Sequence, residues 1–225
     1  MARWLPGYLL LTQLALAGAI FAVGVPATLD ARHELAFRKD ATRLVAAPDA
    51  QGADLIPEAG QISGLVPRSA VEQKELAFAL LARADRPGAS GKGRMELLGR
   101  SSSLFRSYLA LVPADGAAWV GLASVENALG DSRGAVRALK ASILNAPWSA
   151  ALVLGRCGLG IDLFRALDDE GWEMMKGQFR LAAQRSAASL SQVVIAHDGT
   201  RIARVFLAQS PDELVMLEAE LAKRR

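Results

Sequence analysis

The sequence has few of the side chains that most enzymes use for chemistry. It contains one cysteine and two histidines among 225 residues. Cys157 alone excludes an internal disulfide, and no Cys or His stands near it at the spacing of a zinc site. His33 and His197 belong to no pattern typical of metal ligands or of a Ser-His-acid triad. We therefore expect no metal, no cofactor and no catalytic residue. Cys157 is expected to pack between helices, and the histidines are expected to face solvent in turns.

Dense basic blocks and phosphate-binding loops are also missing. The formal net charge of +3 arises from 26 Lys and Arg interspersed with 23 acidic residues, so nucleic-acid binding is not expected. The glycines and lysine of 88–93 superficially resemble a phosphate loop. However, Arg86 occupies the place of the first glycine of such a loop, and Gly93 replaces the Ser or Thr that would hold Mg²⁺. The three glycines of 155–160 have the wrong order for a dinucleotide site and are expected to permit close helix packing.

Aromatic residues make up only 6% of the chain, whereas hydrophobic residues make up 52%, with heavy use of Ala and Leu. These two residues lose little side-chain entropy in helices. The composition therefore predicts an all-α fold, and the length predicts one soluble domain.

One long run lacks any charge, from Trp4 to Pro26. At about 1.5 Å per residue, this run would cover the roughly 30 Å hydrocarbon core of a bilayer. Residues 1–27 are therefore predicted to be a transmembrane anchor. The small residues around Val25–Ala27 leave a cleaved signal segment as the alternative. Basic residues after the span favour a cytoplasmic soluble part, whereas Arg3 ahead of the span favours export. We expect a single-pass membrane protein, and the charges alone leave the side of its soluble domain open.

Residues 28–68 are expected to form a helix over 28–46 and a linker over 48–67, and the helical domain is expected to span 69–225. Apolar residues at spacings of three and four predict helices over 70–84, 95–112 and 148–167. The acidic run 168–170 predicts the start of a further helix. The Ser210–Glu213 capping box predicts a final helix over 211–223. The segment 193–207 suits a short helix or a hairpin around Asp198–Gly199, and we favour the helix.

The stretch from Gly116 to Pro147 carries, in register, the signature positions typical of the 34-residue tetratricopeptide repeat (TPR). Small residues at its signature positions allow two antiparallel helices to approach, large ones fill the space beside them, and the proline ends the second helix. The signature positions are Trp119, Leu122, Ala123, Gly130, Ala135, Leu139 and Pro147. Glu126 departs from the pattern, which usually has a Tyr there. The preceding segment fits as a degenerate repeat, with 87–93 as an insertion.

The pattern predicts a TPR-like right-handed array of antiparallel helical hairpins. In such arrays the first helix of each hairpin lines the groove, which here assigns Val120, Ser124 and Asn127 to partner binding. The alternative is that these three are ordinary surface residues.

The hairpin 116–147, the helix with Arg156 and Leu159, and the ending Val205–Leu214 together resemble small membrane-anchored helical-repeat proteins of alphaproteobacterial type. These are similar to accessory proteins encoded with exopolysaccharide synthesis and export machinery. The resemblance implies an assembly or regulatory role beside a polymerase, translocase or ligase, with no catalytic residues. Together with Arg3 ahead of the span, it also favours a single-pass protein of a bacterial inner membrane with a periplasmic soluble domain.

The expected function is therefore that of a non-catalytic, membrane-anchored scaffold or adaptor that binds protein partners in envelope assembly. Two alternatives remain open. One is a glycan-binding or glycan-acting enzyme of the envelope, which would need groups brought together by the fold. The other is a structural subunit of a membrane complex that acts through its transmembrane helix.

Overall fold

The computed structural model describes residues 67, 69–86, 89 and 91–224. These residues are helical or lie in turns and connections, and none is in a strand, which confirms the all-α prediction for the described part. The predicted anchor of residues 1–27 lies outside the described residues, as does the segment 28–68 apart from Pro67. No helix in the described part is long and apolar enough to cross a membrane.

The helices follow one another with short connections. They are α3 (Ala70–Ala84), α4 (Gly91–Leu111), α5 (Gly116–Ala128), α6 (Ser132–Asn145), α7 (Ala150–Asp162), the 3₁₀ helix η1 (Phe164–Ala166), α8 (Asp169–Ala196), α9 (Thr200–Phe206) and α10 (Pro211–Ala222). The first helix agrees with its predicted bounds. The second begins earlier than predicted, so Gly91–Gly93 belong to a helix and not to the loop.

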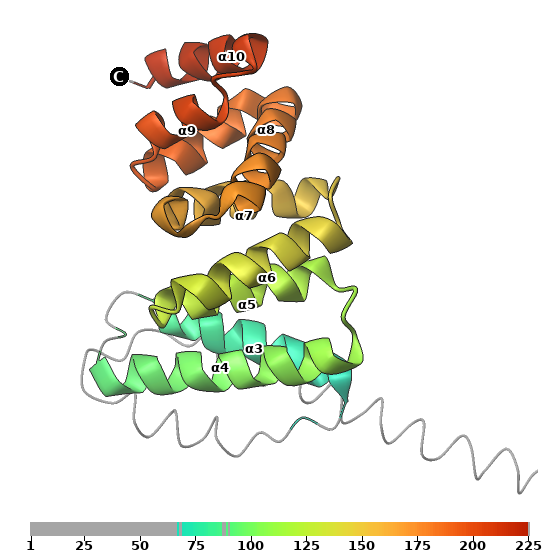
Figure 1. Cartoon of the computed structure of the whole chain (residues 1–225). Helices are drawn as coiled ribbons and strands as arrows, with labels where there is room; N and C mark the ends of the chain where they lie inside the picture. Colours follow the sequence, from blue (N-terminus) through green and yellow to red (C-terminus); the bar gives the residue numbers. More distant parts are fainter. Residues whose placement is uncertain (1–66, 68, 87–88, 90, 225) are drawn as a thin grey trace, which may run out of the picture. The chain divides into compact units, whose positions relative to one another are not determined.

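The helices pack mainly in sequential pairs. Helices α3 and α4, α5 and α6, and α7 and α8 make the most extensive contacts, and α8 also packs against α9 and α10. Each pair contacts the next, through α4 with α5 and through α5 with α7. Figure 1 shows the resulting stack, from α3 and α4 at one end to α10 at the other.

The helix ends follow from local capping chemistry. Asp115, Asp131 and Asp168 each accept a backbone N–H at the start of a helix, which satisfies donors that have no partner inside the helix. The acidic start predicted at 168–170 is thereby confirmed. Ser210, in contrast, makes no capping bond with its side chain, and Glu213 accepts from Gln184 instead. The final helix is present, but the predicted capping box is not formed.

The segment 193–207 is helical, as favoured, but it is not one helix. Its first residues are the end of α8, and α9 begins after the turn His197–Gly199. Asp198 adopts a left-handed conformation with φ of 48°, which Asp tolerates better than most residues. A Cβ on Gly199 would lie 2.5 Å from Ile161 Cδ1. The Asp-Gly pair therefore makes a tight turn between two helices, with the glycine pressed against α7.

The TPR signature residues occupy one hairpin, α5 and α6. Ala123 and Ala135 are fully buried, and Leu139 is nearly so. Gly130 has φ of +86° in the turn between the helices, a conformation that glycine adopts readily. Helix α6 ends at Asn145, just before Pro147. Trp119 is half-buried, and its indole N–H donates to the carbonyl of Pro113 at 2.8 Å.

Glu126, which departs from the repeat pattern, is buried between α5 and α4. Its carboxylate accepts from the Ser102 hydroxyl at 2.6 Å and from Arg106 at 2.9 Å. A buried carboxylate requires such partners, because charge without compensation is costly in a protein interior. Glu126 therefore takes part in joining the first two helical pairs.

The interface between α6, α7 and α8 contains a buried arginine. Arg156 is fully buried and donates to the Ser142 hydroxyl and carbonyl, to the Ala146 carbonyl and to Gln178 Oε1, at 2.7 to 3.1 Å. Burial lowers the pKa of this guanidinium. The carbonyls at the end of α6 carry the negative end of the helix dipole. Arg156 therefore caps one hairpin with a side chain of the next.

Asp115 is the centre of a polar cluster between α3, α4 and α5. Its carboxylate accepts from Lys74 Nζ at 2.8 Å, from the Tyr108 hydroxyl at 2.7 Å, and from the amides of Ala117 and Ala118. Burial alone would raise the pKa of Asp115, but the hydrogen bonds outweigh it and lower the pKa to about 2. Burial and the neighbouring carboxylate raise the pKa of Tyr108 to about 12.

We expect Asp115 to make the free energy of unfolding depend on pH in the acidic range. Its folded-state pKa lies below the ordinary 3.8, so the carboxylate stabilises the fold above about pH 4, and this contribution, on the order of 2 kcal/mol, is lost as the pH falls to about 2. Asp115→Asn keeps a capping side chain but removes the charge. Urea unfolding at several pH values should show the variant less stable at pH 6 and equal to the parent at pH 2. A difference that stays constant with pH would contradict this role.

Candidate functional site

A cavity of about 440 Å³ lies between the first helices of two successive pairs. From α5 it is lined by Ser124, Asn127 and Ala128, and from α7 by Gly155, Leu159 and Asp162. Asp85, Arg94 and His197 complete the lining. They come from the end of α3, from α4 and from the end of α8. The cavity therefore draws on five helices or their ends.

Two of the three residues assigned to partner binding line this cavity, Ser124 and Asn127. Val120 is not in the lining, but its Cγ1 lies 4.0 Å from where a Cβ on Gly155 would be. The structure thus brings the three predicted residues to the same side of α5, next to α7. All three side chains are half-buried.

The two carboxylates of the lining each have a basic or imidazole partner. Arg94 Nε donates to the Ala84 carbonyl at 3.2 Å, and its Nη2 lies 3.9 Å from the Asp85 carboxylate. His197 Nδ1 lies 2.8 Å from Asp162 Oδ1. Each carboxylate of the lining therefore has a partner, and Arg94 is held by Asp85, so neither pair offers an unpaired charged group to a ligand.

Asn127 is the side chain of the lining best placed to meet a ligand. Among the residues that the structure describes, none makes a hydrogen bond with its amide group. The Ser124 hydroxyl donates to the Val120 carbonyl at 3.1 Å, which leaves the oxygen free to accept. An asparagine amide offers donors and an acceptor together. The site can therefore bind a neutral group that both donates and accepts, such as a peptide bond.

Ser124, His197 and Asp162 line one cavity, which calls for a test of nucleophilic catalysis. In a catalytic triad, the histidine nitrogen that faces away from the acid accepts the serine proton. Here His197 Nε2 faces the backbone of α7, 2.7 Å from the position of a Cβ on Gly158. The Ser124 hydroxyl instead donates to Val120. The histidine and the aspartate therefore join α7 to α8, and the serine is not activated in this arrangement.

Other features noted in the sequence have structural positions. Cys157 is fully buried in α7, and burial raises the pKa of its thiol. Gly158 and Gly160 lie against His197 and Met175, as expected for close helix packing, whereas Gly155 is exposed at the cavity. His197 is exposed at the end of α8, but it is paired with Asp162. His33 lies outside the described residues. Within the described part, no cluster of His, Cys, Asp and Glu could hold a metal ion.

Helices α5 and α7 occupy equivalent places in the chain. They begin at Gly116 and Ala150 and end at Ala128 and Asp162, so both ends are displaced by 34 residues. Ala128 and Asp162 are equivalent by this displacement, and both line the cavity. The same displacement carries Val120, Ser124 and Asn127 to Leu154, Gly158 and Ile161, which do not line the cavity, so the 34-residue spacing indicates α7 but not its lining residues. Nothing in the sequence pattern indicates Asp85 or Arg94.

Comparison with known proteins gives no match to a family model, to a curated protein or to a solved structure.

Proposed function

We propose that this chain is a non-catalytic, membrane-anchored scaffold of TPR-like hairpins that binds a segment of a partner protein in the cavity between α5 and α7. The observation that supports this proposal best is the position of Ser124 and Asn127. Both were assigned to a groove from the repeat pattern, and both line a cavity shared with the equivalent helix of the next pair.

The proposed repeat organisation rests on the spacing of the helices. Helices α4 and α6 end at Leu111 and Asn145, again 34 residues apart, as are the ends of α5 and α7. Sequential pairing with short connections is the arrangement in which such repeats bury their apolar faces. The segment 164–166 departs from it, because η1 is inserted between α7 and α8.

The ligand that we propose is an extended segment of polypeptide without a high net charge. In the lining both carboxylates are paired, Asp85 with Arg94 and Asp162 with His197. The Asn127 amide has no partner among the described residues. Together these features suit backbone groups rather than an ionic head group. Helical-repeat arrays use such grooves for extended binding surfaces. The sequence resemblance adds the expectation that the partner belongs to polysaccharide synthesis or export machinery.

The proposed location is the bacterial inner membrane, with the span Trp4–Pro26 as a single anchor and the helical domain in the periplasm. The supporting observation is the charge-free run in the sequence. A scaffold held at the membrane would meet partners of the envelope at high local concentration.

Gly155→Leu is expected to abolish partner binding without unfolding the protein. Gly155 is exposed and lines the cavity, and an added Cβ would meet only Val120 Cγ1, at 4.0 Å. A leucine there would fill the space that the partner segment needs. Leucine also has a higher helix propensity than glycine, so the helix itself should not be weakened. The measurement is crosslinking and purification of the full-length protein from its own membranes, with captured proteins identified by mass spectrometry.

Gly177→Leu is the matched control, because Gly177 lies on α8 with no atom within 4 Å of an added Cβ. Proteins captured by the parent and by the Gly177 variant, but not by the Gly155 variant, would support the proposal. Asn127→Ala should weaken capture of the same proteins. If the Gly155 variant captures the same proteins in the same amounts, the cavity is not the binding site.

A further inference from the structure

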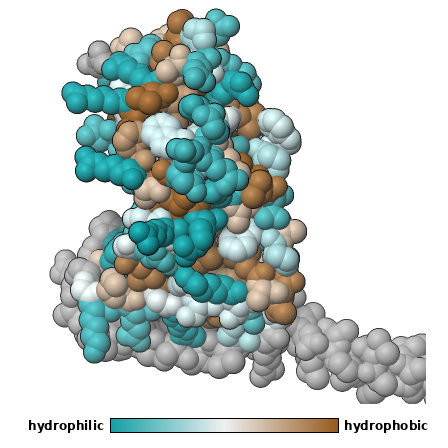
Figure 2. Space-filling view, in the orientation of Figure 1, coloured by the Kyte–Doolittle hydropathy of each residue, from teal (hydrophilic) through white to brown (hydrophobic). Residues whose placement is uncertain are grey.

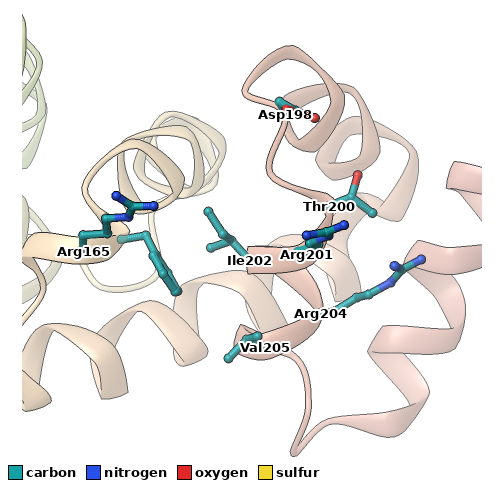
Figure 3. A pocket seen from close by; sticks show the side chains of 8 residues that line it. Arg165, Asp198, Thr200, Arg201, Ile202, Arg204 and Val205 are labelled. Atoms are coloured by element: carbon teal, nitrogen blue, oxygen red, sulfur yellow. The ribbon is translucent and has the colours of Figure 1, made fainter.

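A second cavity lies near the C-terminal end of the stack, apart from the first. It is an open cleft of about 630 Å³ between η1, the turn after α8 and helix α9. Figure 3 shows that Arg165 comes from one side of the cleft and Arg201 and Arg204 from the other, with Ile202 between them. None of its lining residues belongs to the lining of the first cavity.

The charge of this cleft is not balanced. Arg204 is held by a two-point ion pair with Glu218 of α10, at 2.6 and 3.0 Å. Arg165 and Arg201 are exposed, and no carboxylate in the described part of the chain pairs with either. Asp198 is the one acidic residue among the lining residues. With Arg204 paired to Glu218, the lining keeps two guanidinium groups against one carboxylate, an excess of one positive charge.

The walls of the cleft between these arginines are apolar. Phe164, Ile202 and Val205 line it, and Val205 is 50% exposed. The Phe164 ring packs edge-on against the Trp172 ring, with 5.1 Å between the ring centroids. The centroids of the Trp172 and Phe206 rings lie 4.7 Å apart. The apolar wall is thus part of a cluster of aromatic rings that continues into the core. On the face seen in Figure 2, hydrophilic and hydrophobic residues are otherwise interspersed.

These features specify a class of ligand. Arginine binds carboxylate and phosphate with geometry that lysine does not offer, and an apolar wall adds affinity for the body that carries the anion. A cleft of this size lies within the range of about 300 to 1,000 Å³ that holds small molecules. We propose that this cleft binds a small organic anion, a carboxylate or phosphate on an apolar or aromatic body, between Arg165 and Arg201.

The test is a calorimetric titration of the full-length protein, in nonionic detergent, with phenyl phosphate, which measures the dissociation constant. Replacing both Arg165 and Arg201 by serine should weaken binding at least 10-fold. The matched control replaces Arg133 and Arg137 by serine, since both are exposed on α6, and the loss of charge is the same. Inorganic phosphate should bind at least 10-fold more weakly than phenyl phosphate, because it lacks the apolar body.

Two sources could supply such an anion, a soluble molecule or the head group of an anionic lipid. Repeating the titration in micelles that contain phosphatidic acid distinguishes them, since an occupying head group would compete with phenyl phosphate. If phosphatidic acid weakens the binding of phenyl phosphate, the natural ligand of the cleft is a lipid head group. If it does not, the natural ligand is a soluble anion. Equal affinity in the two double variants, or no binding by the parent protein, would overturn the proposal. Neither result bears on the proposal that the cavity between α5 and α7 binds a partner protein, because the two cavities share no lining residue.

Discussion

Replacing Arg156 by methionine is expected to lower the free energy of unfolding by about 3 to 5 kcal/mol. Methionine has a similar length and suits a helix, so the loss comes from hydrogen bonds and not from volume. Without the guanidinium, Gln178 Oε1 loses its donor, and the carbonyls of Ser142 and Ala146 each keep one backbone donor in place of two donors. A hydrogen bond from a charged donor contributes about 1.5 to 3 kcal/mol, and a buried acceptor left without a partner costs about 1 to 3 kcal/mol.

Chemical unfolding of the full-length protein, followed by circular dichroism, measures this effect. Arg137→Met is the matched control, because Arg137 is exposed on α6 and its loss should change stability by no more than about 0.5 kcal/mol. Arg156→Lys should fall between the two, since lysine keeps the charge but cannot reach several acceptors at once. If the Arg156 and Arg137 variants are equally stable, the arginine does not hold the hairpins together.

Hydrogen exchange adds a test of where the damage occurs. Arg156 links α6 to α7 and, through Gln178, to α8. In a stacked array, stability is approximately a sum over units and the interfaces between neighbours. The Arg156→Met variant should therefore lose protection mainly in α7 to α10, while α3 and α4 keep theirs. A uniform loss across all helices would instead indicate one cooperative unit.

Substitution of Gly121 by valine is expected to destabilise the protein by about 2 to 3 kcal/mol. Gly121 lies where α5 crosses α4, and an added Cβ would stand 2.4 Å from Phe105 Cζ. The Phe105 ring is fully buried and packs edge-on against Phe78 at 4.9 Å. A ring held on both sides cannot move aside cheaply, so the extra volume must displace one helix from the other.

Gly99→Val provides the control for this prediction. Gly99 is also inside a helix, but nothing lies within 4 Å of an added Cβ, and valine and glycine differ little in helix propensity. The Gly99 variant should remain within about 0.5 kcal/mol of the parent. Thermal unfolding of the two variants side by side measures the difference. A Gly121 variant as stable as the Gly99 variant would mean that α4 and α5 tolerate a wider separation.

Much of the helical organisation could be predicted from local sequence. The bounds of α3, the turn glycine Gly130 and the acidic cap of α8 all depend on chemistry within a few residues. The segment 193–207, whose sequence suits either a short helix or a hairpin, was also predicted correctly as helical. It was nevertheless divided by the turn at Asp198, because Gly199 packs against Ile161 from a distant part of the chain.

The candidate site shows a sharper division. Ser124 and Asn127 were predicted to face a groove from the repeat pattern, and both line the cavity between α5 and α7. Arg94 and His197 could not be predicted in this way, since they reach the cavity from α4 and from the end of α8. Likewise, the local sequence does not indicate that the Ser210 side chain makes no cap bond, or that the Glu213 carboxylate accepts from Gln184 on another helix.

By itself, the sequence determined the all-α class of the described part, the two helices and the glycine turn between Gly116 and Pro147, and the charge-free run at the N-terminus. Each of these depends on periodicity or on composition within a short window. Only the tertiary structure decided that Arg156 caps a neighbouring hairpin, that Glu126 is buried against α4, and that Arg165 and Arg201 share a cleft. Those positions depend on contacts between residues distant in the chain, which are fixed when the helices pack and not before.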